Sequence, residues 1–136
     1  MILKGRGVAR GTARGALIFS SAPLSFLSGV DPESGRIVEK GHPLFGETIA
    51  GRVLAFSHGK GSTVGSYVLY ALKQNGVAPL AIINEETEPI IAVGAIMAGI
   101  PVVDRLEVPL SKLKSGVLVT VNGDTGEVEY EGSLEG

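Results

Sequence analysis

One glycine-rich stretch, residues 56–66, holds the side chains best suited to chemistry, with the sequence Phe-Ser-His-Gly-Lys-Gly-Ser-Thr-Val-Gly-Ser. A hydrophobic run at 52–56 leads into it and an amphipathic run at 64–74 follows, which predicts a strand, a turn and a helix. The first backbone N–H groups of such a helix lack partners, and its dipole adds about half a positive charge there. The turn therefore favours an anion, with the Ser62 hydroxyl inside it and Lys60 nearby.

Other glycine-rich motifs fit this stretch poorly. A phosphate loop for nucleoside triphosphates reads G-x-x-x-x-G-K-[ST], but here Lys60 is followed by Gly61, and Leu54 occupies the position of the first glycine. The dinucleotide motif G-x-G-x-x-G is absent too. The main alternative is structural, with Ser62 as an ordinary N-cap of the helix.

A catalytic Ser62 would have to act as a base, although its hydroxyl ionises far above neutral pH. A helix terminus supplies about 0.3–1 kcal/mol, or about 2 when partly buried, and one pKa unit corresponds to about 1.36 kcal/mol. A cation at about 4 Å adds roughly 4 kcal/mol at an effective dielectric of 20. Ser62 therefore needs further positive charge, from a partner, a metal or a cluster that binds the substrate.

The remaining candidate groups have simpler structural interpretations. His58 could be a general base or a phosphate acceptor, but His58 and His42 are each more typical of a hydrogen-bonded structural histidine. The acidic run Glu85-Glu86-Thr87-Glu88 could contact a partner, yet acids also favour the start of a helix. Asp31 lies in a turn-forming sequence, where its side chain bonds the local backbone.

Composition narrows the function classes. The 136 residues suit one domain, and 44% hydrophobic with 19% charged residues indicates a globular protein. The absence of cysteine excludes disulfides and iron–sulfur ligation by this chain, and two histidines are too few for a self-contained zinc site based on histidine. A net charge of −2 argues against a protein that binds nucleic acid. With no targeting or membrane-spanning signal, we expect a cytoplasmic protein. A basic start and an acidic end predict two strand faces that lie side by side.

The elements around the stretch predict an α/β fold, in which a central βαβαβ unit is flanked by strands that form a second layer. Residues 22–34 look irregular. We expect helices at 64–74 and from 87 or 88 to 99, and strands at 2–10, 13–20, 36–39, 52–56, 79–84, 100–103, 117–121 and 127–130.

Five segments together resemble the small subunit of the aconitase X family. The resemblance covers nearly the whole chain and rests on residues 31–35 (DPESG), 41–43 (GHP), 59–66 (GKGSTVGS), 78–84 (APLAIIN) and 94–104 (GAIMAGIPVVD).

This resemblance implies a swivelling β/β/α domain over residues 1–136 and a hydro-lyase subunit that is inactive alone. Its partner would be a large subunit that carries a [4Fe-4S] cluster. The family's serine base corresponds to Ser62, and Lys60, Gly61 and Thr63 would bind the substrate. The branch that it resembles most dehydrates (R)-5-phosphomevalonate to trans-anhydromevalonate 5-phosphate in archaeal isoprenoid synthesis.

Three alternatives stay open. Relatives in the family act on other hydroxy acids, including hydroxyproline. The residues Gly99-Ile100-Pro101-Val102-Val103 and Gly123-Asp124-Thr125-Gly126 also resemble the phosphohistidine carrier domain of enzymes that use phosphoenolpyruvate. That domain has Thr-Ser-His at its helix start, where this chain has Gly61-Ser62-Thr63. The third alternative is a non-catalytic regulatory module, for which altering Ser62 would leave activity unchanged.

Overall fold

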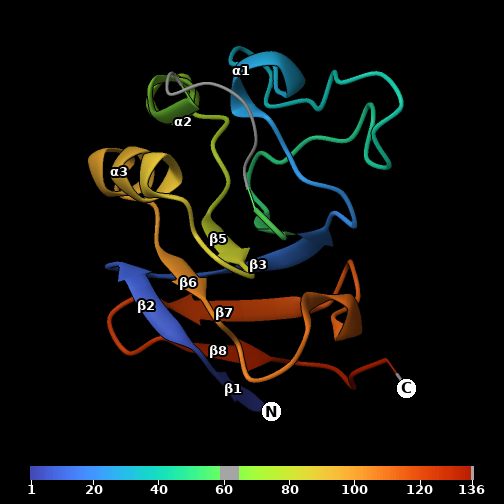
Figure 1. Cartoon of the computed structure of the whole chain (residues 1–136), viewed down its shortest axis with the longest axis vertical. Coiled ribbons are helices and arrows are strands. Elements are labelled where there is room, and N and C mark those ends of the chain that lie inside the picture. Colours follow the sequence, from blue (N-terminus) through green and yellow to red (C-terminus); the bar gives the residue numbers. More distant parts are fainter. Residues whose placement is uncertain (59–64, 136) are drawn as a thin grey trace.

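The computed structural model describes residues 1–58 and 65–135 and arranges them in three layers (Figure 1). The helical elements are α1 (Phe26–Gly29), α2 (Gly65–Gln74), α3 (Pro89–Ala98) and the 3₁₀ helix η1 (Leu110–Lys112). The strands are β1 (Ile2–Lys4), β2 (Arg6–Ala9), β3 (Thr12–Phe19), β4 (Val53–Phe56), β5 (Ala81–Asn84), β6 (Val102–Asp104), β7 (Leu118–Asn122) and β8 (Glu127–Tyr130).

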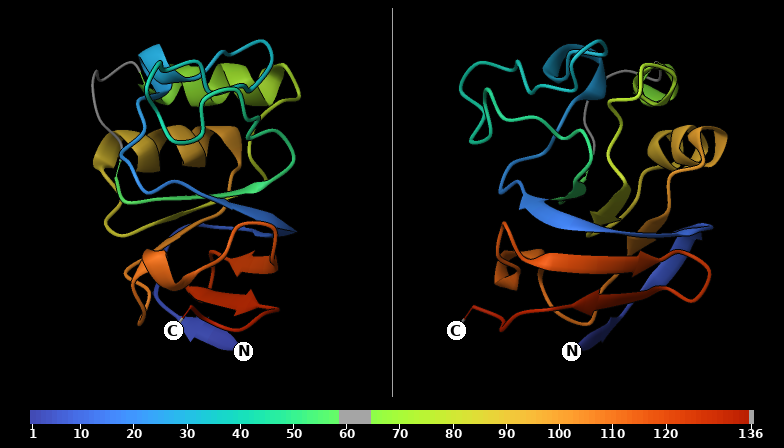
Figure 2. Two further views of the ribbon diagram at one scale, coloured as in Figure 1. Left: turned by 90° about the vertical axis from the view of Figure 1, so that its right-hand side faces the viewer. Right: turned by 180° about the vertical axis from the view of Figure 1, so that it is seen from behind.

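The strands follow the order β1-β8-β7-β3-β4-β5-β6-β2. Strands β3 to β6 are mutually parallel, and the remaining neighbours pair antiparallel. The parallel strands form the middle layer, with the helices on one face and β7, β8 and β1 on the other (Figure 2). This β/β/α layering is the predicted fold, and the β4-α2-β5-α3-β6 unit is the predicted βαβαβ unit.

Two hydrophobic cores lie on the two faces of the parallel layer. One lies under the helices and includes Phe56, Leu69 and Ile82. The other lies against the antiparallel strands and includes Val53, Ile83 and Tyr130. Because both faces are covered, every residue of β4 and of β5 is buried, as parallel strands require.

Local signals explain the limits of α3. Pro89 is in its first turn, where a missing N–H costs nothing. Gly99 ends the helix with a left-handed φ of 70°, a conformation that glycine adopts without strain. The N–H of Ile100 then donates to the carbonyl of Ala95 at 2.9 Å. The predicted C-terminal boundary at Gly99 is therefore confirmed.

The start of the chain differs from the prediction of a single strand at 2–10. It forms two strands, β1 and β2, which lie at opposite ends of the strand order and are separated only by Gly5. A Cβ on Gly5 would lie 2.5 Å from the carbonyl oxygen of Asp104. The chain crosses between layers here because glycine permits the close approach.

Two other expectations were wrong. Residues 36–39 form no strand and contribute only two isolated bridges, Val30 with Ile37 and Arg36 with Thr48. The irregular segment 22–34 contains the short helix α1. Both features span only a few residues, which is too short for sequence periodicity to distinguish them.

The basic start and the acidic end do lie side by side, as predicted. Strand β1 pairs with β8, so that Lys4 is opposite Glu127, and the Arg14 side chain forms an ion pair with Glu131 at 2.8 Å. Within the described residues, no helix combines the length and the apolar character needed to cross a bilayer.

Candidate functional site

The parallel strands β3, β4, β5 and β6 end at the same edge of the sheet, which we call the carboxyl edge. In open α/β sheets this is where ligands bind. The helices α2 and α3 begin at this edge, because each follows a parallel strand and runs back along the sheet. Polar residues follow all four strands: Ser20, Ser57, Glu85 and Arg105.

The four predicted site residues, Lys60, Gly61, Ser62 and Thr63, lie outside the described residues. The structure describes their flanks. His58 follows β4 at the carboxyl edge, and Gly65 begins α2. Chain order therefore sets the predicted site between the end of a buried strand and the start of a helix, although its own geometry remains a prediction.

The start of α2 is held close to α3 by a glycine. A Cβ on Gly94 would lie 2.7 Å from the Cα of Ser66, and 3.1 Å from a methyl carbon of Leu69. A side chain at position 94 would therefore push the two helices apart. Gly94 thus sets the distance of α2 from α3 near the carboxyl edge.

A network centred on Asp104 occupies the end of β6. The Asp104 carboxylate is fully buried and accepts bonds from Arg6 Nε at 2.9 Å and Nη2 at 2.7 Å. It also accepts the backbone N–H of Thr87 at 2.8 Å. Arg105 makes a second two-point contact, with Glu86, at 2.9 and 2.7 Å. These bonds tie β2 and the β5–α3 loop to the end of β6.

Electrostatics within this network are balanced. Burial by itself would raise the pKa of the Asp104 carboxyl, but the bonds from Arg6 and the Thr87 N–H outweigh it and hold the pKa below its usual range. The hydrogen bond from Arg105 likewise lowers the pKa of Glu86. Two guanidinium groups thus face two carboxylates, and the network leaves no net positive charge for a substrate.

Because the pKa of Asp104 is lowered in the folded chain, the free energy of unfolding depends on pH. The unfolded chain, in which the carboxyl titrates at about 3.9, binds its proton first, so stability is present above that pH and is lost as pH falls. We expect Asp104→Asn to lower the free energy of unfolding by about 2 kcal/mol at pH 7. This is below the about 3–5 kcal/mol for a fully buried pair, because the Arg6 side chain is 45% exposed.

Urea unfolding at a series of pH values measures this effect. The wild-type chain should lose stability below about pH 4 more steeply than Asp104→Asn does. Parallel pH curves for the two proteins would contradict the assignment.

Asn84, at the end of β5, has one unsatisfied polar atom. Its side chain is fully buried, and Nδ2 donates to the carbonyl of Phe56 at 2.9 Å. Its Oδ1 has no hydrogen-bond partner among the described residues. A buried acceptor left in this state costs about 1–3 kcal/mol, so Asn84 is a polar group at the carboxyl edge with unused bonding capacity.

His42 forms a structural pair with Ser20. The backbone N–H of Leu44 donates to His42 Nδ1 at 3.0 Å, so the ring proton lies on Nε2, which contacts the Ser20 Oγ at 3.2 Å. The Ser20 hydroxyl therefore accepts from the ring and donates to the carbonyl of Ala22 at 2.7 Å. His42 is not arranged to deprotonate Ser20, which agrees with its structural interpretation.

Asp31 and His58 differ in their surroundings. Asp31 accepts the hydroxyl of Ser34 at 2.7 Å and the N–H of Glu33 at 3.1 Å, which confirms its structural role in the turn. The hydrogen bond from Ser34 lowers the Asp31 pKa. His58 is exposed, and its backbone carbonyl accepts the N–H of Leu24 at 3.4 Å.

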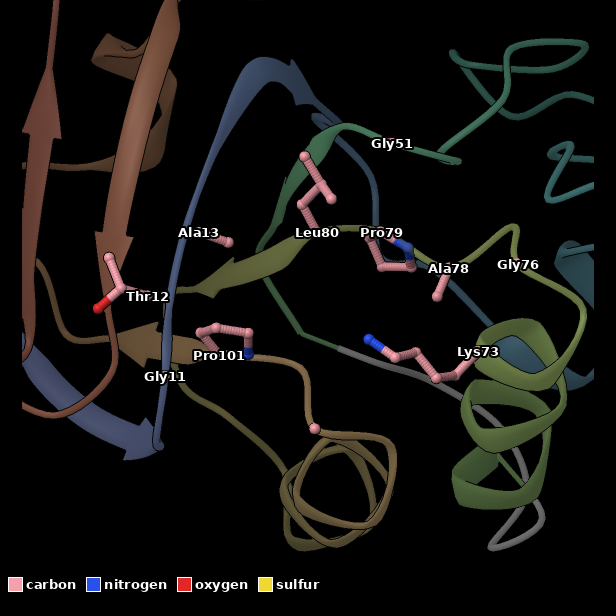
Figure 3. Close-up of a pocket in the computed structure, with 11 residues that line it drawn as sticks. Gly11, Thr12, Ala13, Gly51, Lys73, Gly76, Ala78, Pro79, Leu80 and Pro101 are labelled. Carbon is pink, nitrogen blue, oxygen red and sulfur yellow. The ribbon is translucent and has the colours of Figure 1, made fainter.

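A cavity of about 410 Å³ lies at the opposite edge, where the parallel strands begin. Lys73 has the only ionisable side chain among the described residues that line it, and Figure 3 shows its amine pointing inward past Pro79. One lysine and one hydroxyl, that of Thr12, among glycine, proline and apolar side chains provide no acid–base pair. The carboxyl edge is therefore the better candidate site.

Sequence reasoning missed the Asp104 network, because its charged pair joins residues 98 positions apart. One signal was available, since Asp104 directly follows a run of buried apolar residues and a charge there needs a partner. No group of three or more potential metal ligands occurs in the described ranges 1–58 and 65–135.

Comparisons with known proteins agree with this fold. A model of the aconitase X swivel domain matches residues 2–130. A phosphomevalonate dehydratase small subunit from Methanosarcina acetivorans is 59% identical over 93% of this chain and 89% of its own length. One from Pyrococcus furiosus is 57% identical over 95% of both. The crystal structure of Thermococcus kodakaraensis aconitase X in its holo-form matches with a TM-score of 0.92 and 53% identity, over 96% of this chain and 98% of that one.

Proposed function

Because the chain belongs to the aconitase X swivel-domain family, we propose that it is the small subunit of a phosphomevalonate dehydratase. The reaction is the elimination of water from (R)-5-phosphomevalonate, which gives trans-anhydromevalonate 5-phosphate. The observation that carries this proposal is identity of 57–59% along nearly the full length of two relatives with that name. Identity at this level extends over almost the whole chain and not only to its fold.

In the proposed reaction Ser62 is the general base. Its deprotonated oxygen takes the proton from the carbon next to the substrate carboxylate, and the C–H electron pair forms the carbon–carbon double bond. The hydroxyl on the adjacent carbon leaves with the C–O electron pair and becomes water on protonation. Ser62 then releases the proton that it took, so that the net loss is one water. Lys60, Gly61 and Thr63 bind the anionic substrate at the start of α2, where backbone N–H groups and the helix dipole favour negative charge. These residues lie in the sequence between β4, which ends at the carboxyl edge, and α2, which begins there, and this order supports the assignment.

The charge balance of the carboxyl edge explains why the subunit needs a partner. Arg6 and Arg105 are neutralised by Asp104 and Glu86, so they add little to the acidity of a serine hydroxyl. The further positive charge must come from Lys60 and from the large subunit. This chain has no cysteine, so the iron–sulfur cluster expected in the family, a Lewis acid for the leaving hydroxyl, would be held by the large subunit.

Reconstitution tests the proposal. The isolated chain and the isolated large subunit should each be inactive with (R)-5-phosphomevalonate, and the mixture should produce the anhydro product, measured by mass spectrometry as loss of water. Hydroxyproline is the control substrate and should not react. Turnover of hydroxyproline but not of phosphomevalonate would assign the chain to another branch of the family. Transfer of phosphate to His58, seen by intact mass, would favour a carrier instead.

A further inference from the structure

Helix α3 is apolar on two opposite sides. Its inner side packs in the core through Ile91, Gly94, Ala95 and Ala98. Its outer side, which we call the α3 outer face, consists of four exposed residues at positions i, i+4, i+7 and i+8: Pro89, Val93, Ile96 and Met97.

The α3 outer face is unusual for a helix that borders solvent. Val93, Ile96 and Met97 are 49%, 62% and 52% exposed, and the whole helix contains no charged residue. A surface helix ordinarily has polar residues on its outer side, and a helix that is apolar all round is normally buried. Exposed apolar surface of this kind marks an interaction site.

An apolar groove of about 300 Å³ adjoins this face, between α3 and the end of β2. It is lined by Val8, Ala9, Arg10, Ala95, Ile96 and Gly99. The Arg10 side chain is exposed, and it forms no ion pair or hydrogen bond within the part of the chain that the structure describes. The groove therefore matches an apolar side chain that is accompanied by a carboxylate.

The size and position of the face indicate which partner covers it. A stable interface buries about 800 Å² on each partner, and a helix of ten residues is only about 15 Å long. The partner must therefore extend beyond α3. This helix begins at the carboxyl edge, next to Thr87 of the Asp104 network. It ends at Gly99 beside the groove, near the edge where the parallel strands begin. A partner that covers the α3 outer face along its whole length also reaches the carboxyl edge, where the proposed site needs positive charge from the large subunit.

We propose that the α3 outer face and its groove bind the large subunit, through an apolar segment that brings a carboxylate to Arg10. This inference rests on the proposed function, which supplies the partner. The surface lies on the side of α3 away from the core, so its residues contribute to assembly and not to folding of the isolated chain.

Binding to the tagged cognate large subunit, measured by biolayer interferometry, tests the surface. Ile96→Lys should weaken binding about 100-fold or more, since it introduces a charge at the centre of an apolar contact. Ile2→Lys is the matched control, because Ile2 is 58% exposed on β1, and it should change the affinity by no more than about twofold. Arg10→Glu should weaken binding about tenfold and reduce its salt dependence. Circular dichroism should show that all three variants fold.

The possible outcomes test the binding surface and the proposed reaction separately. If Ile96→Lys and Ile2→Lys bound the large subunit with equal affinity, the α3 outer face would not be its binding surface, even if the complex dehydrates phosphomevalonate. A complex that depends on Ile96 but has no dehydratase activity would support the surface and refute the reaction. Self-association of the wild-type chain in sedimentation, lost in Ile96→Lys while large-subunit binding is kept, would assign the face to a second copy and overturn the proposal.

Discussion

Replacing Ser62 by alanine is expected to lower kcat of the assembled enzyme by about 10²–10⁴-fold, the usual contribution of a positioned general base. The substitution removes the one oxygen that would accept the substrate proton and leaves the backbone N–H groups at the start of α2 in place. KM should therefore change much less than kcat. Steady-state kinetics with (R)-5-phosphomevalonate and the reconstituted complex measure both constants.

Ser57→Ala provides the matched control for this experiment. Ser57 follows β4 at the same edge. Its interactions with other described residues are through its backbone carbonyl, which accepts the N–H groups of Glu85 at 3.0 Å and of Glu86 at 3.4 Å. Removing its hydroxyl should leave kcat within about twofold, because those contacts are retained. If Ser62→Ala kept near-normal kcat in an intact complex, the base assignment would be wrong, and the N-cap interpretation of Ser62 would stand.

Gly123→Ala is expected to destabilise the fold by about 3 kcal/mol or more, at the upper end of what overpacking costs. An added Cβ would overlap the carbonyl oxygen of Ala9 and lie 2.9 Å from its carbonyl carbon. Both atoms belong to the backbone of the last residue of β2, so neither can rotate away. The melting temperature should fall by about 10 °C or more for a chain of this size, as measured by differential scanning calorimetry.

Gly116→Ala separates this steric effect from backbone strain. Gly116 has a φ of 90°, but no atom lies within 4 Å of an added Cβ. Its substitution should cost only the strain of a left-handed conformation, about 1–2 kcal/mol. Equal losses of stability in the two variants would show that the contact between Gly123 and Ala9 is not the limiting constraint.

Local sequence patterns predicted the regular part of the fold well. The strand at 127–130 and the end of α3 at Gly99 agree with the structure. Strands β4 and β5 lie inside the predicted ranges 52–56 and 79–84. These elements depend on hydrophobic periodicity, caps and turn residues, which are properties of neighbouring positions in the chain.

Other features depend on contacts between distant segments, and the sequence did not reveal them. By sequence, Gly123 is typical of a turn between the predicted strands at 117–121 and 127–130, whereas the structure shows that its lack of a side chain admits the backbone of Ala9. The division of the first strand at Gly5 and the pairing of Arg6 with Asp104 have the same origin. None of them has a local pattern, because each partner lies about 100 positions away.

The sequence by itself determined the β/β/α class, the family resemblance and the residue types of the proposed site, with Ser62 in a glycine turn before a helix. Only the tertiary structure decided that the carboxyl edge carries a charge-balanced network, and that Ile96 of α3 faces outward while Ile91 faces the core. A helix that is apolar all round has no periodic difference between its sides. Packing against the sheet therefore determines which side of the helix is buried, and the residues of that sheet lie far away in the chain.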